Sequence, residues 1–227
     1  MELLLAEELL LLALDDEKGS SWNSRLEFGL AGALLVDLGR VGALRSEGKE
    51  LHLVDAAAPE HPLLVRAYDV IAGSGKPRSA KAWLSRLPRR LKPITGTVAT
   101  GLVERGVLSE QRRKVLGVFP STRFPQADPG PERLLRDRLT AVLDGQRRPE
   151  ERDALLFGLL VPVELVSELV DWSQRRAARE RAKQIADGGI AGDAVARAVQ
   201  AQVTVAVTAA MAGAAGAAAG GAGAGGG

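Results

Sequence analysis

A glycine-rich stretch ending in lysine is the first feature of this sequence that could bind phosphate. Residues 73–76 read Gly-Ser-Gly-Lys. A phosphate-binding P-loop needs a glycine five residues before the Gly-Lys pair and a hydroxyl after it, but those positions hold Val70 and Pro77. A dinucleotide-binding fingerprint also fails, because Arg78 occupies the place of its third glycine. Neither nucleotide-binding motif is present.

The residues that most often carry catalysis or bind metals are scarce. Cysteine is absent, which excludes disulfides, thiolate ligands and cysteine nucleophiles and fits a reducing compartment. His52 and His61 are the only imidazoles, and neither belongs to a metal-binding pattern. The acidic triplet at 15–17 is more typical of a solvated loop than of an acid–base pair, and no serine lies in a nucleophile elbow. We therefore expect no metal site and no cofactor.

The distribution of charge is more informative than the net charge of +2. Residues 1–60 hold 5 basic and 12 acidic side chains, residues 61–148 hold 18 and 7, and residues 149–227 hold 7 and 9. A basic segment between acidic or neutral flanks gives one part of the surface a positive potential. This charge pattern predicts a polyanionic partner, and both phosphate-bearing lipid and nucleic acid qualify.

Two apolar stretches are too weak to predict a membrane span. Residues 154–163 make up about half of the roughly 20 residues needed to cross a bilayer and include Pro162. Residues 203–219 consist largely of Ala, Gly, Val and Thr, which bury little apolar area. The first residues carry carboxylates where a secretory signal carries positive charge. We expect a protein that stays in the cytoplasm, at the cytosolic face, without a membrane span.

Hydrophobic periodicity predicts a mainly helical chain with short β-hairpins. The Leu-rich segment 2–14 is apolar around most of a helix, which predicts burial, and Gly29 and Gly32 in the next helix would let a neighbour approach closely. The expected helices span 2–14, 22–38, 64–71, 80–87, 94–106, 132–143, 149–160, 163–186 and 192–211, with a hairpin within 41–53 and a strand over 114–119. Residues 1–211 are predicted to form one compact helical-bundle domain. Residues 212–227, all Ala and Gly, are predicted to be a disordered tail.

Several ordered blocks resemble the Golgi phosphoprotein 3 family. The opening blocks are 7–19, which includes Glu-Glu-Leu-Leu-Leu-Leu-Ala-Leu-Asp-Asp-Glu, and 29–38. The blocks at 102–108 (Leu-Val-Glu-Arg-Gly-Val-Leu), 116–120 and 152–156 follow in the family's order and spacing. The resemblance covers nearly the whole chain up to Met211. The abundance of Ala, Gly and Arg, with one tyrosine, indicates a bacterial member.

The resemblance implies a single helical domain without catalytic activity that attaches peripherally to membranes through phosphatidylinositol 4-phosphate. In the family, the headgroup is held by a tryptophan before the second helix and by arginines. Trp22 matches that tryptophan, and Lys92 matches one of the arginines. Ala31 and Thr95 stand where the family has two further arginines. Losing two guanidinium groups weakens a charge-assisted phosphate site.

Other basic residues near these positions offer a partial replacement. Arg89 and Arg90 precede Lys92 closely, and each basic side chain near an anionic surface adds about 1 kcal/mol to membrane binding. We therefore predict that Trp22, Lys92, Arg89 and Arg90 bind the lipid headgroup. The predicted contacts with membrane or a second subunit are Phe119, Phe124, Arg112, Arg113 and Lys114. For Trp22 and the two phenylalanines, burial in the core is the alternative.

Two other classes of function remain open. Two helix-glycine-hairpin units around a basic middle segment also describe a tandem winged-helix nucleic-acid-binding protein. However, the helices at 26–38 and 94–104, which would have to read DNA, are apolar, glycine-rich or acidic over much of their surface, which disfavours nucleic acid. A protein-interaction scaffold is the third class, and the Arg-rich segment 172–183 would suit it.

Overall fold

The computed structural model describes residues 2–15, 18–21, 23, 25–54, 58–115, 119–188 and 194–220, and over these residues the chain is mainly helical. The α-helices are α1 (Leu5–Ala13), α2 (Leu26–Arg40), α3 (Pro62–Ala72), α4 (Ala80–Arg90), α5 (Ile94–Glu104), α6 (Gly130–Leu143), α7 (Glu151–Leu160), α8 (Arg175–Asp187) and α9 (Ala194–Gly220). Two short 3-10 helices, η2 (Leu165–Leu169) and η3 (Trp172–Gln174), lie between α7 and α8. The hairpins are β1 (Leu44–Glu47) with β2 (Glu50–Leu53) and β3 (Gln111–Val115) with β4 (Phe119–Arg123).

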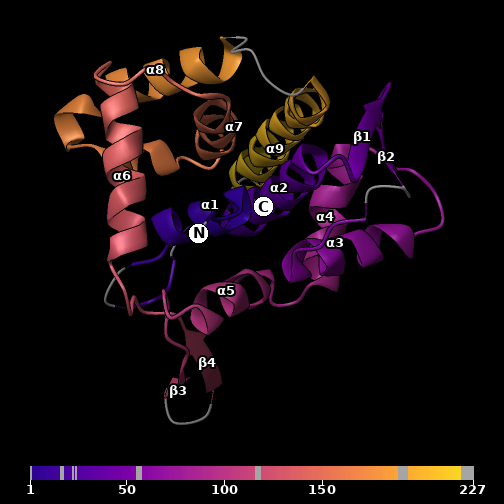
Figure 1. The fold of residues 1–227 in the computed structure, drawn as a ribbon, viewed down its shortest axis with the longest axis horizontal. Coiled ribbons are helices and arrows are strands. Elements are labelled where there is room, and N and C mark those ends of the chain that lie inside the picture. The colour runs from indigo at the N-terminus through magenta and orange to yellow at the C-terminus, as the bar shows by residue number, and fades with distance from the viewer. Residues whose placement is uncertain are drawn as a thin grey trace, which may run out of the picture.

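Helices α1 and α2 lie side by side in the centre of the molecule, and the other helices surround them (Figure 1). Eight of the nine residues of α1 are buried, as predicted from its apolar circumference. Glycine permits the closest approaches to α2. A Cβ added at Gly32 would lie 2.8 Å from Val203 of α9, and one added at Gly29 would lie 3.0 Å from Val163. The prediction that these two glycines admit close neighbours is confirmed.

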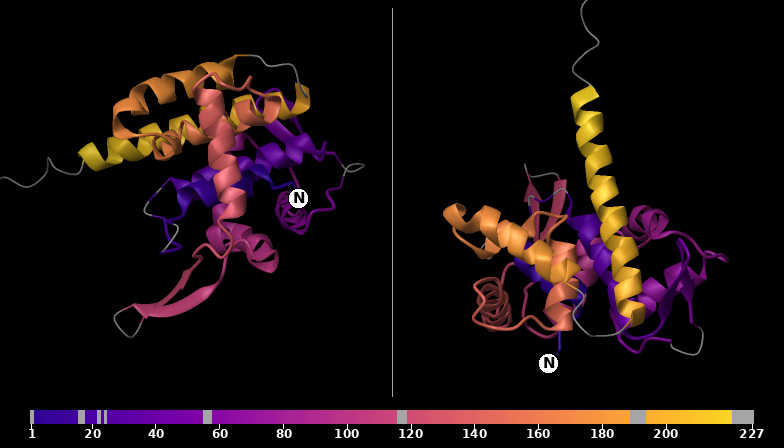
Figure 2. Two further views of the ribbon diagram at one scale, coloured as in Figure 1. Left: turned by 60° about the vertical axis from the view of Figure 1, so that its left-hand side comes forward. Right: turned by 90° about the horizontal axis from the view of Figure 1, so that it is seen from above.

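Helix α9 is the longest helix and runs along α2 across the molecule (Figure 2). Its Gln202 donates hydrogen bonds to Ser46 and, at 3.0 Å, to the carbonyl of Gly48, which ties it to the β1–β2 hairpin. The helix continues to Gly220, past the predicted domain boundary at residue 211. The division into a domain and a disordered tail stays a prediction, and residues 221–227 lie outside the described residues.

A hairpin follows the helix at 94–104, as predicted, but the strand predicted over 114–119 is not one strand, because its two ends belong to β3 and β4. Strand β3 ends at Val115, which pairs with Phe119 at the start of the antiparallel β4, and Arg112 pairs with Thr122. The sequence pattern misplaced the strand because a short apolar run with a central glycine has the same composition in a strand as across the turn of a hairpin. The hairpin projects away from the helices at the bottom of Figure 1.

The helix predicted over 163–186 is broken in its first third. Glu164 adopts a left-handed conformation with φ of 63°, and Val170 is extended, so that only α8 is regular. The side-chain amide of Asn23 donates a hydrogen bond of 2.8 Å to the carbonyl of Val163. A helix starting at 163 would use this carbonyl for its own ladder. The partner that competes for it is 140 positions away in the sequence.

Buried charges tie α1 to the surrounding helices. Asp37 of α2 accepts hydrogen bonds of 3.0 Å from the backbone N–H groups of Leu5 and Ala6, which otherwise lack acceptors at the start of α1. The ion pairs of this network are Glu7 with Arg105, Glu8 with Arg138 and Arg152, and Asp153 with Arg138. Among the described residues, no helix is both long and apolar enough to span a membrane.

Candidate functional site

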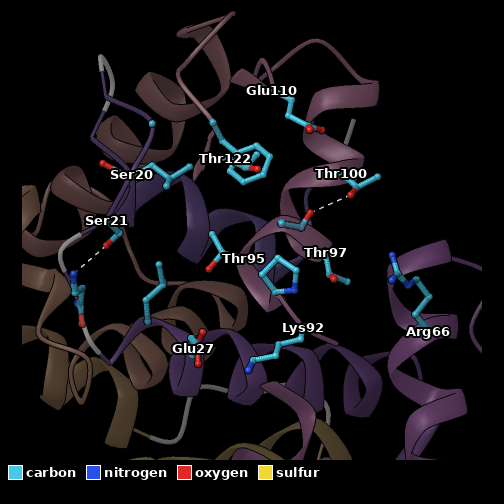
Figure 3. A pocket seen from close by; sticks show the side chains of 17 residues that line it. Ser20, Ser21, Glu27, Arg66, Lys92, Thr95, Thr97, Thr100, Glu110 and Thr122 are labelled. Carbon is cyan, nitrogen blue, oxygen red and sulfur yellow. Dashed lines mark hydrogen bonds between the residues drawn. The ribbon is translucent and has the colours of Figure 1, made fainter. Parts of the chain in front are cut away.

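A solvent-open pocket of about 790 Å³ lies where the chain after α1, the first turns of α2 and α5, and the base of the β3–β4 hairpin meet. Figure 3 shows side chains from all of these segments facing it. About half of its lining is polar. The hydroxyl and amide groups come from Ser20, Ser21, Asn23, Thr95, Thr97, Thr100 and Thr122.

Gly19 holds the loop after α1 against the base of the hairpin. Its φ is +58°, a conformation that L side chains rarely adopt. The backbone N–H of Phe124 donates a hydrogen bond of 2.8 Å to the carbonyl of Gly19, and a Cβ added at Gly19 would overlap the backbone of Phe124 and Pro125. The position therefore requires glycine for two reasons, its positive φ and the close approach of the neighbouring backbone. This contact sets one wall of the pocket.

The first turn of α5 forms another wall. The helix begins after Pro93, and the first N–H groups of a helix have no acceptor within it. Thr95 and Gly96 lie in this turn and line the pocket. The hydroxyls of Thr97 and Thr100 donate to the carbonyls of Leu91 and Gly96, both at 2.9 Å. A helix N-terminus at a polar pocket favours an anionic ligand.

Two cations from different elements line the pocket. Lys92 comes from the link between α4 and α5, and Arg66 comes from α3; both are exposed. Glu27 and Glu110 also line it, and Glu110 pairs with Arg112 at 2.7 Å. Figure 3 draws Lys92 and Glu27 at the lower edge of the pocket and Arg66 at its right-hand edge. The two cations could contact different parts of one anion.

The structure brings only some of the predicted headgroup residues to this pocket. Lys92 lines it, and Trp22 lies outside the described residues, although its neighbours Ser21 and Asn23 line the pocket. Arg89 and Arg90 are exposed at the end of α4 and do not line it. These two arginines therefore belong to the surrounding surface and not to the pocket itself.

The predicted membrane contacts divide in a similar way. The side chain of Arg112 on β3 is 84% exposed. Phe124 is only 8% exposed and belongs to the hydrophobic core. Burial of its ring is favourable in free energy, which supports the alternative given for it, and we do not include it in the proposed membrane contact. The side chains of Arg113, Lys114 and Phe119 lie outside the described residues.

Sequence reasoning missed Arg66 and did not anticipate the role of Gly19. Arg66 is the one arginine of the amphipathic helix α3. A charged residue at such a position predicts only that this side of the helix faces solvent. Ala31, which stands at a family arginine position, is fully buried in α2 and does not line the pocket. Nothing in the sequence indicates that α3 brings a guanidinium to the pocket from elsewhere.

Comparisons with known proteins agree on one family. A model of the Golgi phosphoprotein 3 family matches residues 5–202. Vacuolar protein sorting-associated protein 74 from Schizosaccharomyces pombe is 27% identical over 164 residues, which are 62% of this chain and 48% of that protein. The chain thus spans about half the length of this curated relative.

Proposed function

Because the chain belongs to the Golgi phosphoprotein 3 family, we propose that it is a non-enzymatic peripheral membrane protein that binds an anionic phospholipid headgroup in the pocket lined by Arg66 and Lys92. Phosphatidylinositol 4-phosphate is the proposed lipid, since the members of this family bind it. The proposal places the protein on the cytosolic face of a membrane.

The observation that carries the proposal is that Arg66 and Lys92, from different elements, both line the pocket beside the first turn of α5. A phosphate monoester accepts several charge-assisted hydrogen bonds, each worth about 1.5–3 kcal/mol. Arg66 supplies a guanidinium that the buried Ala31 cannot supply. The hydroxyl of Thr95 and the N–H groups of the helix N-terminus add uncharged donors.

The surroundings of the pocket support binding without catalysis. Neither histidine lines it, and Thr97 and Thr100 already donate their hydroxyl protons to backbone carbonyls. Over the described residues there is no group of three or more His, Asp or Glu side chains that could hold a metal ion. Besides Glu27 and Glu110, of which Glu110 is paired with Arg112, the pocket offers hydroxyl donors and two cations, which suit recognition of a headgroup.

The β3–β4 hairpin extends from the base of the pocket and is proposed as the second part of the membrane contact. Both ends of the hairpin are anchored beside the pocket, where Glu110, Thr122 and Phe124 line it. The exposed Arg112 lies on β3. We include Arg113, Lys114 and Phe119 in the proposed contact from their positions in the hairpin, and contact with a second subunit at Phe119 is its alternative.

The alternative function, binding of nucleic acid by a tandem winged helix, is less well supported than lipid binding. A DNA-reading helix must expose base-contacting side chains along one face. Helix α2, one candidate for that role, is buried along twelve of its fifteen residues. In α5, the other candidate, Ile94, Val98 and Leu102 are buried and its pocket side presents threonines and glycine.

Vesicle sedimentation tests the proposal. The Arg66→Ala/Lys92→Ala variant is compared with wild type on phosphatidylcholine vesicles that contain either phosphatidylinositol 4-phosphate or phosphatidylserine at equal total charge. We expect the variant to lose about tenfold or more in affinity for the inositol lipid, because two charge-assisted contacts disappear. Its affinity for phosphatidylserine should fall much less.

The control variant is Lys76→Ala/Arg148→Ala, which removes the same charge at exposed positions outside the pocket. It should bind like wild type. Equal losses on both lipids, or equal losses in both variants, would show that the pocket does not recognise the headgroup.

A further inference from the structure

A second basic surface lies on the opposite side of the loop that forms the pocket wall. A groove of about 990 Å³ runs between the end of α7, η2, α8 and α9. Its cationic lining consists of Arg25, Arg175, Arg176, Arg179 and Lys183, and its acidic lining consists of Glu164, Glu180 and Asp187. Arg25 pairs with Glu164 at 2.5 Å, which leaves the α8 cations in excess over the remaining carboxylates.

The cations of α8 occupy positions that weaken the helix. Arg175, Arg179 and Lys183 follow each other at intervals of four, so like charges are stacked on one helical face. Arg175 also opens the helix, where positive charge opposes the helix dipole. The opposite face packs Ala178 and Ala182 into the core. An anion in the groove would relieve both penalties.

These cations have few partners within the protein. Over the described residues, none of Arg175, Arg176, Arg179 and Lys183 has a carboxylate oxygen within 4.0 Å of its side-chain nitrogens. The hydrogen bond from Arg25 holds the pKa of Glu164 below its ordinary value, and the charge of Arg179 contributes to that shift from a greater distance. The groove therefore keeps a positive field that faces solvent.

An exposed tryptophan lies beside this field. Trp172 forms the start of η3, directly before α8, and 82% of its surface is exposed. A single exposed apolar side chain is common on protein surfaces. Its position three residues before Arg175, the first cation of the groove, is what makes Trp172 a candidate for membrane contact. Tryptophan is enriched at the boundary between lipid headgroups and acyl chains, where its ring is apolar and its N–H stays hydrated.

The groove and the pocket share one stretch of chain. Asn23 lines the pocket, and Arg25, two residues later, lines the groove. In the left view of Figure 2, the β3–β4 hairpin, the beginning of α8 and the far end of α9 all reach toward the left-hand side of the molecule. A flat surface that meets the hairpin could therefore also meet the start of α8.

We propose that the α8 groove and Trp172 form a second contact with the same anionic membrane. The inference rests on the proposed function, because it adds one more membrane-contacting area to the pocket and the β3–β4 hairpin. The pocket would recognise one headgroup, whereas the groove would respond to the surface charge of the membrane whatever lipid supplies it. The tryptophan ring would insert at the headgroup level.

Binding to vesicles with and without the inositol lipid separates the two contacts. The groove variant is Arg175→Gln/Arg176→Gln/Arg179→Gln, in which glutamine keeps a good helix propensity. On phosphatidylcholine–phosphatidylserine vesicles at low KCl, we expect it to bind about tenfold to a hundredfold more weakly than wild type. The loss should shrink at high KCl, because salt screens exposed charges.

The charge-matched control is Lys76→Gln/Arg148→Gln/Arg181→Gln, whose residues line neither the groove nor the pocket. A groove variant that binds like this control would overturn the inference. The Arg66→Ala/Lys92→Ala variant should bind these vesicles nearly as well as wild type does. It should lose only the additional affinity that phosphatidylinositol 4-phosphate gives to wild type. If that gain persists in the pocket variant while the groove variant still weakens binding, the pocket proposal fails and the groove proposal stands.

Tryptophan fluorescence tests the insertion directly. Because Trp22 is a predicted headgroup residue, the test uses phosphatidylcholine–phosphatidylserine vesicles, which contain no inositol lipid. In a Trp22→Phe background the remaining tryptophans are Trp172 and Trp83, which is 1% exposed. Vesicles with brominated acyl chains should quench the emission, and the further change Trp172→Phe should abolish the quenching. An unquenched Trp172, or tighter binding of the groove to duplex DNA than to vesicles, would contradict the membrane assignment.

Discussion

At the scale of single residues, Gly19 decides whether the pocket wall can form. Its positive φ and its contact with the backbone of Phe124 and Pro125 both depend on the missing side chain. Lys92 and Arg66 supply charge at the pocket, but they do not set its shape. A substitution at Gly19 therefore separates the geometry of the pocket from its charge.

We predict that Gly19→Ala is more destabilising than the same change at another left-handed glycine. Gly75 has a φ of +67° and open space around its Cβ position, so Gly75→Ala should cost only the conformational penalty of about 1–2 kcal/mol. Gly19→Ala adds the displacement of the loop and should also reduce binding to the inositol lipid. Urea unfolding and vesicle sedimentation of both variants measure this. Equal stability losses would mean that the contact with Phe124 is unimportant.

At the scale of elements, the packing of α9 against α2 depends on glycine at position 32. A Cβ there would lie 2.8 Å from Val203, closer than side chains normally approach. Alanine is nevertheless the better helix former by about 1 kcal/mol. The two effects oppose each other, so the sign of a Gly32→Ala change depends on whether Val203 leaves room.

We predict that Gly32→Ala lowers the free energy of unfolding in the wild-type background and raises it, by up to about 1 kcal/mol, in a Val203→Ala background. The reason is that shortening Val203 removes the overlap and leaves only the gain in helix propensity. A double-mutant cycle by urea unfolding measures the coupling. If the two changes are additive, the close approach of α9 to α2 does not constrain this position.

Regular periodicity predicted most of the helices, and long-range contacts account for the failures. The Leu-rich first helix and the helix at 26–40 were recognisable because their apolar positions repeat consistently. The break after Val163 depends on Asn23, which is distant in the sequence. For the pocket, Lys92 came from the family resemblance, whereas Arg66 reaches it only through the packing of α3. Local patterns predict elements, and tertiary packing decides which side chains meet.

At the scale of the whole molecule, part of the basic excess of the middle segment is neutralised inside the fold. Arg105 and Arg138, from the basic segment, pair with Glu7 and Glu8 of the acidic N-terminal segment. Both glutamates are nearly fully buried. The charge counted along the sequence therefore overstates the positive surface. The exposed cations of the middle segment include those of the pocket and Arg112 of the hairpin, together with Arg89 and Arg90 at the end of α4.

The same buried network should make the stability of the molecule depend on pH through Asp37. Burial raises the pKa of Asp37 from 3.8 to about 7, although the N–H groups of Ala6 and Leu5 and the charges of Arg40 and Arg152 act in the opposite direction. Between these two values the folded protein holds a proton on Asp37 that the unfolded chain has released. The contribution of Asp37 therefore favours the folded state most at low pH and is lost as the pH rises through about 7.

We predict that Asp37→Asn removes this part of the pH dependence, because asparagine cannot titrate. Urea unfolding on the acidic and the alkaline side of neutrality should show wild type losing more stability between the two than the variant does. Asparagine leaves one of the two N–H groups at the start of α1 without its acceptor, so on the acidic side the variant should be less stable than wild type by about 1–3 kcal/mol. This difference should shrink on the alkaline side, where wild type loses the contribution of Asp37. The exposed Asp69→Asn in α3 is the control and should keep the wild-type slope. If Asp37→Asn and Asp69→Asn give the same pH dependence, Asp37 is ionised in the folded protein throughout this range and its pKa is not raised.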